Sequence, residues 1–108
     1  MLQNTRVIGE RGQPLGFCTI KEDELYQLFV TRAARGTNVA IRLIDDGEAR
    51  LAAVGYKLAW LSCAIGNERA ARFYEKRGWY CARTFTSVLN TAKGKFELEA
   101  WRYEKVLA

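Results

Sequence analysis

The sequence predicts one α+β domain over residues 1–108, with a mixed, mostly antiparallel sheet and helices in the order β-β-β-α-β-α-β-β. Short runs rich in β-branched and aromatic residues lie at both ends of the chain, and two segments between them have helical spacing of apolar residues. A further short apolar run separates those two segments. A strand, a crossover helix and another strand imply one parallel pair in an otherwise antiparallel sheet.

The first part of the chain predicts an antiparallel meander of three strands. Gly12 and Pro14 mark the first turn, and the "KEDE" segment at residues 21–24 forms the second. Alternation along the third strand places three side chains on one face: Tyr26, Leu28 and Val30. The three strands are expected at residues 5–10, 15–20 and 25–31.

An amphipathic helix is expected at residues 38–54, where apolar residues recur at steps of three and four. Gly55 fits the position that ends such a helix. The next run, "KLAWLSCA" at residues 57–64, is too short and too rich in β-formers for a helix and predicts a buried strand.

A second, shorter helix is expected after Asn67, which is a good N-cap residue. Glu68 lies in its first turn and Lys76–Arg77 in its last, as the helix dipole favours, and Gly78 ends it. The chain then closes with a hairpin of two long strands, "WYCARTFTSVL" and "KFELEAWRYEKVL", around the turn "NTAKGK".

The composition is that of an ordinary globular protein, because hydrophobic residues make up 49% and charged residues 27% of the 108 residues. No apolar run approaches the ~20 residues that a membrane-spanning helix needs. The N-terminal stretch "MLQNTRVIGERG" has no signal-peptide core. We therefore expect a cytoplasmic protein without a membrane partner.

Cysteine and histidine usage narrows the chemistry. The cysteines Cys18, Cys63 and Cys81 are far apart and lie in apolar, strand-like runs. This favours buried free thiols in a reducing cytoplasm over disulfides or a metal site. The chain has no histidine, which excludes a His-ligated metal and a Ser-His or Cys-His nucleophile. No metal is expected.

The net charge of +5 has two readings, a solvated basic surface or an anionic partner such as nucleic acid or a phosphate-bearing ligand. No run of like charges stands out, which argues against nucleic acid. A local phosphate site stays open, and "VTRAARGTNVAIRLI" is a candidate. Amides at a helix N-terminus attract phosphate, and Arg32 and Arg35 add positive charge beside them. Taken alone, this loop is more often an ordinary β-to-α connection with solvated arginines.

The segment "LSCAIGNERAARFYEKRGWYCART" at residues 61–84 favours the phosphate site over an ordinary loop. Asn67 alone is explained as a helix cap, and Phe73–Tyr74 as an apolar helix face. Together with "RGTNVAIRLI", however, the segment resembles the GNAT superfamily of acetyl-CoA-dependent N-acetyltransferases. In that family the first loop reads Arg/Gln-x-x-Gly-x-Gly/Ala, and the later segment reads Asn-x-x-Ala-x-x-Phe-Tyr-x-x-x-Gly-Phe.

The later pattern is matched in spacing and type, with Trp79 in the final aromatic place, and the resemblance covers the chain from about Thr5. It implies that the loop amides hold the pyrophosphate of acetyl-CoA. It also implies that the strand ends near Val30 and Ala64 pair with the pantetheine arm, which Asn67 hydrogen-bonds. The implied cofactor-binding residues are Phe29, Val30, Arg35, Gly36, Thr37, Asn38, Val39, Ala40 and Asn67.

The resemblance further implies direct attack of an amine on the thioester, without an enzyme nucleophile. Tyr74, with the ordinary tyrosine pKa near ~10, would protonate the departing thiolate. Glu22 or Glu24, just before the central strand, would take the proton of the amine through water, and Glu24 is our candidate. Both carboxylates also fit a plain solvated turn.

Two departures from the family pattern stand out. Asn38 occupies the place of the central glycine of the loop, and asparagine tolerates unusual backbone angles and favours helix starts. Family members also carry a strand and two helices before the meander, where this chain has about five residues. The resemblance thus implies a short GNAT form, either truncated or completed by a partner chain.

The leading hypothesis is an acyl-CoA-dependent N-acyltransferase that acetylates an amine from acetyl-CoA. The rival is a non-catalytic module that binds CoA or dimerises. A third alternative, a small RNA-binding domain, is weaker because Trp60 and Phe29 lie in apolar runs typical of a core. A homodimer is expected, joined through the terminal hairpin or the edge of the first strand. The hairpin carries much apolar surface: Trp79, Phe85, Phe96, Leu98, Trp101 and Tyr103.

Overall fold

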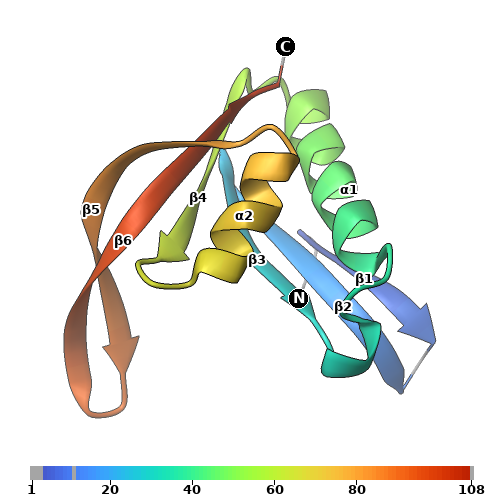
Figure 1. Cartoon of the computed structure of the whole chain (residues 1–108), viewed down its shortest axis with the longest axis horizontal. Coiled ribbons are helices and arrows are strands. Elements are labelled where there is room, and N and C mark those ends of the chain that lie inside the picture. Colours follow the sequence, from blue (N-terminus) through green and yellow to red (C-terminus); the bar gives the residue numbers. More distant parts are fainter. Residues whose placement is uncertain (1–3, 11, 108) are drawn as a thin grey trace. The chain divides into compact units, whose positions relative to one another are not determined.

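A computed structural model describes residues 4–10 and 12–107 (Figure 1). Its elements follow the predicted order, with one added 3₁₀ turn, η1, before the first helix. Arg11, within the first predicted turn, and the first three residues of the N-terminal stretch lie outside the described residues. The elements are β1 (Thr5–Glu10), β2 (Gln13–Lys21), β3 (Glu24–Val30), η1 (Arg32–Ala34), α1 (Val39–Val54), β4 (Leu58–Ala64), α2 (Glu68–Lys76), β5 (Tyr80–Thr91) and β6 (Gly94–Val106).

The chain divides into two compact units. The N-terminal unit takes in the described parts of residues 1–59 and 106–108, and the C-terminal unit is Trp60–Lys105. The prediction of one domain over the whole chain stays a prediction, and each unit is described by itself.

In the N-terminal unit, β1, β2 and β3 form an antiparallel meander, and α1 packs on β2 and β3 (Figure 1). Leu43 and Ile44 of α1 are fully buried together with Cys18 of β2. Gly47 lets the helix approach the sheet, because a Cβ at this position would lie 3.0 Å from Cys18 Sγ and 3.1 Å from Leu25 Cδ1. The apolar stripe of the helix therefore builds the core of this unit, as its spacing predicted.

Two sequence predictions in the meander were wrong. Pro14 lies inside β2 and not in the turn. It pairs with Gly9 of β1, next to an irregular point of the β1–β2 register. A proline is tolerated there because a bulge needs fewer ladder hydrogen bonds. Tyr26 does not lie on one face with Leu28 and Val30, since it is 49% exposed, those two residues are half-buried, and Leu25 is buried. The β2–β3 register slips between Thr19 and Ile20 opposite Tyr26, and this extra residue shifts the alternation by one.

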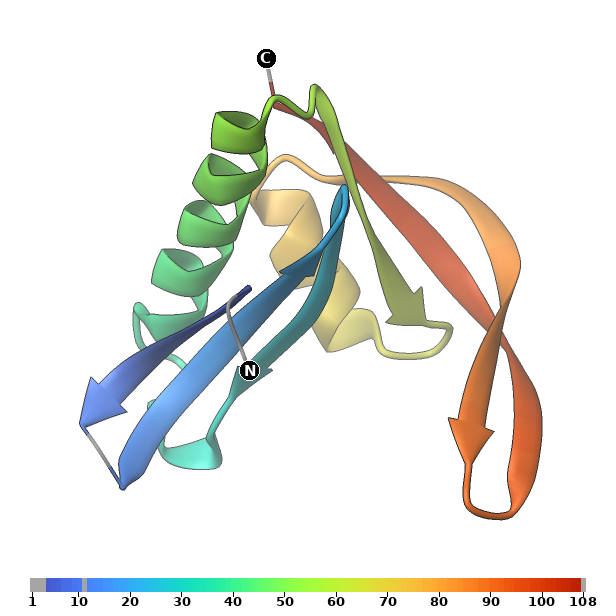
Figure 2. The same ribbon diagram turned by 180° about the vertical axis from the view of Figure 1, so that it is seen from behind.

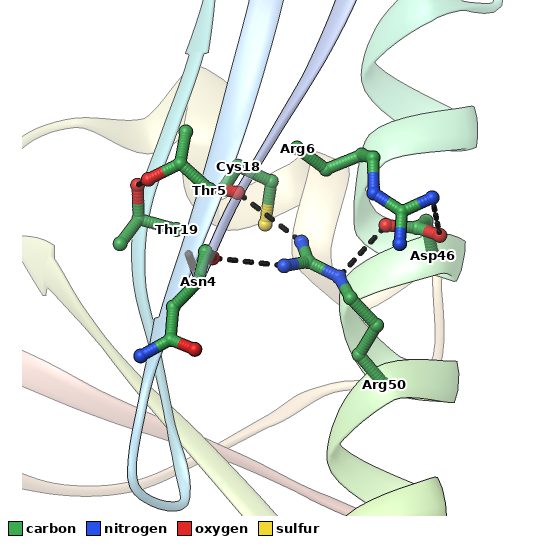
Figure 3. Close-up of polar contacts among 7 residues, drawn as sticks. All are labelled: Asn4, Thr5, Arg6, Cys18, Thr19, Asp46 and Arg50. Carbon is green, nitrogen blue, oxygen red and sulfur yellow. Dashed lines mark hydrogen bonds and ion pairs between the residues drawn. The ribbon is translucent and has the colours of Figure 1, made fainter. Parts of the chain in front are cut away.

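Arg50 ties α1 to the meander (Figure 3). Its guanidinium donates to Asn4 O at 2.8 Å and to Cys18 O at 3.1 Å, so it reaches two neighbouring segments at once. Its Nε lies 2.8 Å from Asp46 Oδ2, an ion pair whose atoms are not aligned as a hydrogen bond, and Arg6 lies 3.6 Å from the other oxygen of Asp46. The Arg50 side chain is only 16% exposed, so its charge is matched by these acceptors and not by water alone.

In the C-terminal unit, β6 lies between β4 and β5, and β5 and β6 form the long twisted hairpin seen in Figure 2. The strand β4 alternates, with Ala59, Leu61 and Cys63 buried and the residues between them more open, so one face of it is buried and not the whole strand. Trp79 and Tyr103 are each 2% exposed and form the aromatic core of the unit. The expectation that both contribute to an apolar surface of the hairpin was therefore wrong, because their rings pack against Tyr74 of α2. Towards the hairpin turn the side chains open to solvent.

The cysteine prediction was correct for two residues of three. Cys18 and Cys63 are buried free thiols, whereas Cys81 is exposed on β5. Burial raises the pKa of Cys18 to about 11 and also raises the pKa of Cys63. Among residues 4–10 and 12–107, no helix is long and apolar enough to cross a membrane. Within the same described residues, His, Cys, Asp and Glu form no group of three suited to a metal ion.

Candidate active site

The cofactor residues predicted on β3 lie at the end of that strand. Val30 is its last residue, and Thr31 N continues the pairing by donating to Leu15 O at 2.9 Å. Phe29 is 50% exposed and stacks on Phe17, with ring centroids 5.6 Å apart. The expectation that Phe29 is a core residue was therefore wrong, because its apolar run lies on a face of the N-terminal unit that is left partly open.

The loop after β3 is held by its own hydrogen bonds. Thr37 N donates to Ala34 O at 3.2 Å, and the Thr37 hydroxyl donates to the same oxygen. That hydroxyl in turn accepts from Val39 N at 3.3 Å. Gly36 has φ +79°, a left-handed backbone that glycine adopts without strain, and a Cβ there would meet nothing within 4 Å. Internal hydrogen bonds therefore hold the loop in a defined turn, and the space next to Gly36 is open.

The helix α1 begins at this loop without help from its N-cap side chain. Asn38 occupies the N-cap position, with φ −78° and ψ 0°, and its side chain makes no capping hydrogen bond. Asn38 needs no unusual backbone angle, because the positive φ falls at Gly36. The first N–H groups of any α-helix lack partners within the helix, and here they adjoin the exposed Arg35. These features fit an anionic ligand, and the residues that would hold it are Arg35–Ala40.

The predicted N-cap of α2 is confirmed. Asn67 Oδ1 accepts from Ala70 N at 3.3 Å, and Asn67 O accepts from Ala71 N at 3.1 Å. Glu68 and Lys76 lie in the first and last turns as expected, and Gly78 follows the helix with φ +93°. The side chain of Asn67 is exposed, so its amide NH₂ group is open to a further partner while its oxygen caps the helix.

Tyr74 lies on α2 within an aromatic cluster of the C-terminal unit. Its ring centroid is 5.6 Å from that of Phe73, 6.1 Å from that of Tyr103 and 6.4 Å from that of Trp79. Trp79 N also donates to Tyr74 O at 3.0 Å. Tyr74 is half-buried, so both a packing role and a role at the surface are compatible with its surroundings.

Comparison with known proteins identifies the family. Residues 4–79 match the model of the acetyltransferase (GNAT) family, and this range contains the loop, Asn67 and Tyr74. The chain belongs to the GNAT family. No match was found among curated proteins.

Solved structures share the GNAT fold of this chain. A GCN5-related N-acetyltransferase from Rhodopseudomonas palustris is 24% identical, with a TM-score of 0.75, over 94% of this chain and 60% of its own. The protein yncA from Salmonella typhimurium, solved with its cofactor acetyl-CoA, is 13% identical with a TM-score of 0.75, over 96% of this chain and 64% of its own. Arabidopsis thaliana Naa50 in complex with the bisubstrate analogue CoA-Ac-MVNAL is 17% identical with a TM-score of 0.74, over 95% of this chain and 72% of its own.

These likenesses confirm the predicted fold class, an α+β GNAT fold with a mixed sheet. The chain spans less than two thirds of the length of the first two of these GNAT structures. Its activity, substrates and partners are therefore argued below as proposals.

The two candidate bases of the GNAT reaction lie away from the loop within the N-terminal unit. Glu24 is the first residue of β3 and pairs with Lys21, whereas Val30 is the last residue of that strand. Six residues of strand at ~3.3 Å each separate them by roughly 20 Å. Glu22 lies in the preceding turn with φ 54°. The meander therefore does not bring these carboxylates to the loop, and the assignment of Glu24 stays a prediction.

Sequence reasoning missed two side chains of β6 that contact the helix carrying Tyr74. Tyr103 donates its hydroxyl to Glu75 Oε2 at 2.7 Å, and Lys105 Nζ donates to Arg77 O at 2.7 Å. Alternation along β6 places these two residues on one face, which is a usable signal. Their partners stand 28 residues earlier in the chain, so no local pattern connects them.

Proposed function

We propose that this chain is an N-acetyltransferase that transfers the acetyl group of acetyl-CoA to an amine. The observation that carries the proposal is the family match over residues 4–79, which includes both segments in which the GNAT motifs were found. Two structures of the same fold support it, since one contains acetyl-CoA and the other an analogue that joins CoA to an acetylated peptide.

The start of α1 is the proposed site for the pyrophosphate of acetyl-CoA. The N–H groups of Thr37 and Val39 are already used inside the loop. The proposed donors are therefore the N–H groups of Gly36, Asn38 and Ala40, with Arg35 adding a charge-assisted contact. Thr37 and Val39 contribute by holding the turn in shape.

The pantetheine arm is proposed to contact two further places. One is the end of β3, where Phe29 and Val30 offer backbone groups and an exposed ring. The other is Asn67, whose side-chain NH₂ group is a donor suited to an amide carbonyl of the arm. Because the Asn67 oxygen already caps α2, the helix fixes the direction of that donor.

The proposed reaction is direct transfer. The nitrogen of the amine attacks the thioester carbonyl carbon, a C–N bond forms, and the C–S bond breaks. The amine loses one proton to a base, for which Glu24 acting through water is the candidate, and the departing thiolate gains one from the Tyr74 hydroxyl. The products are the acetylated amine and free CoA, and no covalent enzyme intermediate is needed.

We also propose a cytoplasmic homodimer. Phe96 and Leu98 near the tip of the hairpin are 49% and 50% exposed, and apolar surface of this kind favours association. A reducing compartment suits the exposed Cys81, which would otherwise oxidise. Static light scattering over a dilution series tests the assembly, and a monomer at every concentration overturns it.

Calorimetric titration with acetyl-CoA, followed by a panel of amines, tests the function. Transfer is best followed by mass spectrometry of the acceptor, because thiol-reactive dyes also label the exposed Cys81. A Cys81→Ser variant allows a dye assay as a cross-check. Binding with turnover supports the transferase, binding without turnover supports a CoA-binding module, and no binding overturns both.

A further inference from the structure

Within the C-terminal unit, two side chains of strand β6 donate hydrogen bonds to helix α2 and to the residue that follows it. The Tyr103 hydroxyl donates to Glu75 Oε2 at 2.7 Å, and the Lys105 ammonium donates to Arg77 O at 2.7 Å. The first bond reaches the residue next to Tyr74, and the second reaches the C-terminal end of the helix, where the dipole favours a cation. Glu75 lies in the last turn of α2, and Arg77 is the residue that follows the helix.

Tyr103 also contacts Tyr74 directly. The two ring centroids are 6.1 Å apart, and Trp79 lies on Tyr74 at 6.4 Å. Tyr103 and Trp79 are each 2% exposed, so both rings are enclosed in the packed interior of the unit. Tyr74 is thus packed against two buried rings. The strand β6, which carries Tyr103, is also hydrogen-bonded to Glu75, the residue next to Tyr74 on the helix.

The bond from Tyr103 to Glu75 is one of the contacts that limit the rotation of α2 about its axis. Successive residues of an α-helix differ by about 100° in direction, so holding Glu75 fixes where the Tyr74 side chain projects. The buried hydroxyl of Tyr103 needs a partner, and burial, followed by the hydrogen bond to Glu75, raises the pKa of Tyr103 well above its usual value. Tyr103 therefore remains a donor over the whole working range of pH.

We propose that Tyr103, acting with Glu75, is a positioning residue for Tyr74 in acetyl transfer. The proposal rests on the proposed function, in which the Tyr74 hydroxyl protonates the thiolate. A proton donor must lie within hydrogen-bond reach of its acceptor, and a displacement of about 1 Å costs up to ~10²-fold in rate. The Tyr103–Glu75 bond supplies the constraint that keeps the hydroxyl in place.

The activity test uses Tyr103→Phe, which keeps the ring and removes the hydroxyl. We expect kcat to fall roughly tenfold, with the KM for acetyl-CoA unchanged, because position and not binding is disturbed. Glu75→Ala gives the same loss, and Glu75→Gln restores most of the rate because its amide oxygen still accepts. Tyr80→Phe is the matched control, since it removes a similar bond, from Tyr80 to Glu104 at 3.2 Å, that joins β5 to β6 and involves no residue of α2. Equal kcat for wild type, Tyr103→Phe and Glu75→Ala overturns the proposal.

A spectroscopic test of the same variants does not need turnover. The protein is labelled with ¹³C at tyrosine Cζ, and the Tyr74 signal is assigned with Tyr74→Phe. We expect this signal to move in Tyr103→Phe and in Glu75→Ala, which leaves every ring in place, and to stay unchanged in Tyr80→Phe. Glu75 is exposed, so Glu75→Ala is informative even where Tyr103→Phe unfolds. An unmoved Tyr74 signal in both variants overturns the positioning role. If the signal moves in the variants but the wild type has no transferase activity, the proposed function fails, whereas the positioning of Tyr74 by Tyr103 and Glu75 stands.

Discussion

In the described part of the chain, the α-helices α1 and α2 each follow an asparagine, and the two asparagines have different roles. Asn67 caps α2, because its Oδ1 accepts from Ala70 N at 3.3 Å. Asn38 occupies the same position at α1, yet its side chain makes no capping bond. There the hydroxyl of Thr37 accepts from Val39 N instead. One helix start is closed by its own cap, and the other is shaped by the residue before it and leaves amides facing outward.

In the proposed function, this difference assigns phosphate binding to the start of α1 and proton transfer to α2. The start of α1 lies beside Arg35 and the open Gly36, features that suit the phosphates of acetyl-CoA. The side chain of Asn67 caps the start of α2, and the helix carries Tyr74 against the buried rings of Trp79 and Tyr103. Variants at the start of α1 should therefore change affinity, and variants within α2 should change rate or stability. Asn67 caps α2 and is also proposed to contact the pantetheine arm, so its variants can change both affinity and stability. The predictions below test that separation.

The largest effect is expected at Tyr74. Tyr74→Phe should lower kcat by roughly 10²-fold, the scale of one general acid, with little change in the KM for acetyl-CoA. Steady-state kinetics with the amine identified in the panel measures both constants, and Tyr56→Phe, an exposed site beyond α1, serves as the control. An unchanged kcat would make Tyr74 a packing residue only.

A smaller effect, on affinity alone, is expected at Arg35. Arg35→Ala should raise the Kd for acetyl-CoA about tenfold, since one charge-assisted hydrogen bond of ~1.4 kcal/mol is lost. The remaining binding should also depend less on salt. Calorimetry measures both, with Arg72→Ala on α2 as a control of equal charge change.

A pantetheine fragment without the pyrophosphate separates the causes of such a loss. Its affinity should be the same for wild type and Arg35→Ala. A parallel loss for the fragment and for acetyl-CoA would remove Arg35 from the phosphate site.

The caps themselves predict unequal stability. Asn67→Ala should lower the free energy of unfolding by ~1 kcal/mol, because the Ala70 N–H loses its acceptor. Asn38→Ala should change it by only a few tenths of a kcal/mol, because no capping bond is lost. Urea unfolding of both variants decides this, and equal losses would mean that Asn38 caps α1 in solution.

The smallest effect is expected for Asn38→Gly. Removing a side chain that makes no cap bond should tighten acetyl-CoA binding by roughly twofold, a few tenths of a kcal/mol, if it crowds the phosphates. Calorimetry under the conditions used for Arg35→Ala measures it. Weaker binding would show that the loop needs the asparagine.

Most of the fold followed from local patterns, and the exceptions have physical causes. The helix limits agree with periodicity and with Gly55, because one residue in a left-handed conformation ends α1. The exposure of Tyr26 did not follow, since a bulge in the β2–β3 register depends on both strands. The exposure of Phe29 did not follow either, because an apolar run does not reveal which face lacks a cover.

In the candidate site, too, some features could be predicted from the sequence and others could not. The Asn67 cap was predictable from residue type alone. At the other helix, Thr37 and Asn38 are both good capping residues, and the sequence cannot tell which one accepts. The bond from Tyr103 to Glu75 joins residues 28 apart and appears only once β6 and α2 are packed. Contacts of that kind depend on the fold and not on a motif.

The claim that the two helix starts differ is tested most directly by an amide NMR titration with ADP, which carries a pyrophosphate and no pantetheine. We predict that the amide signals of Gly36, Asn38 and Ala40 shift with ADP concentration, because their N–H groups bind the phosphates. The amide of Ala70, which is held by Asn67, should not shift. Equal shifts at both helix starts, or none at Gly36, Asn38 and Ala40, would contradict the account.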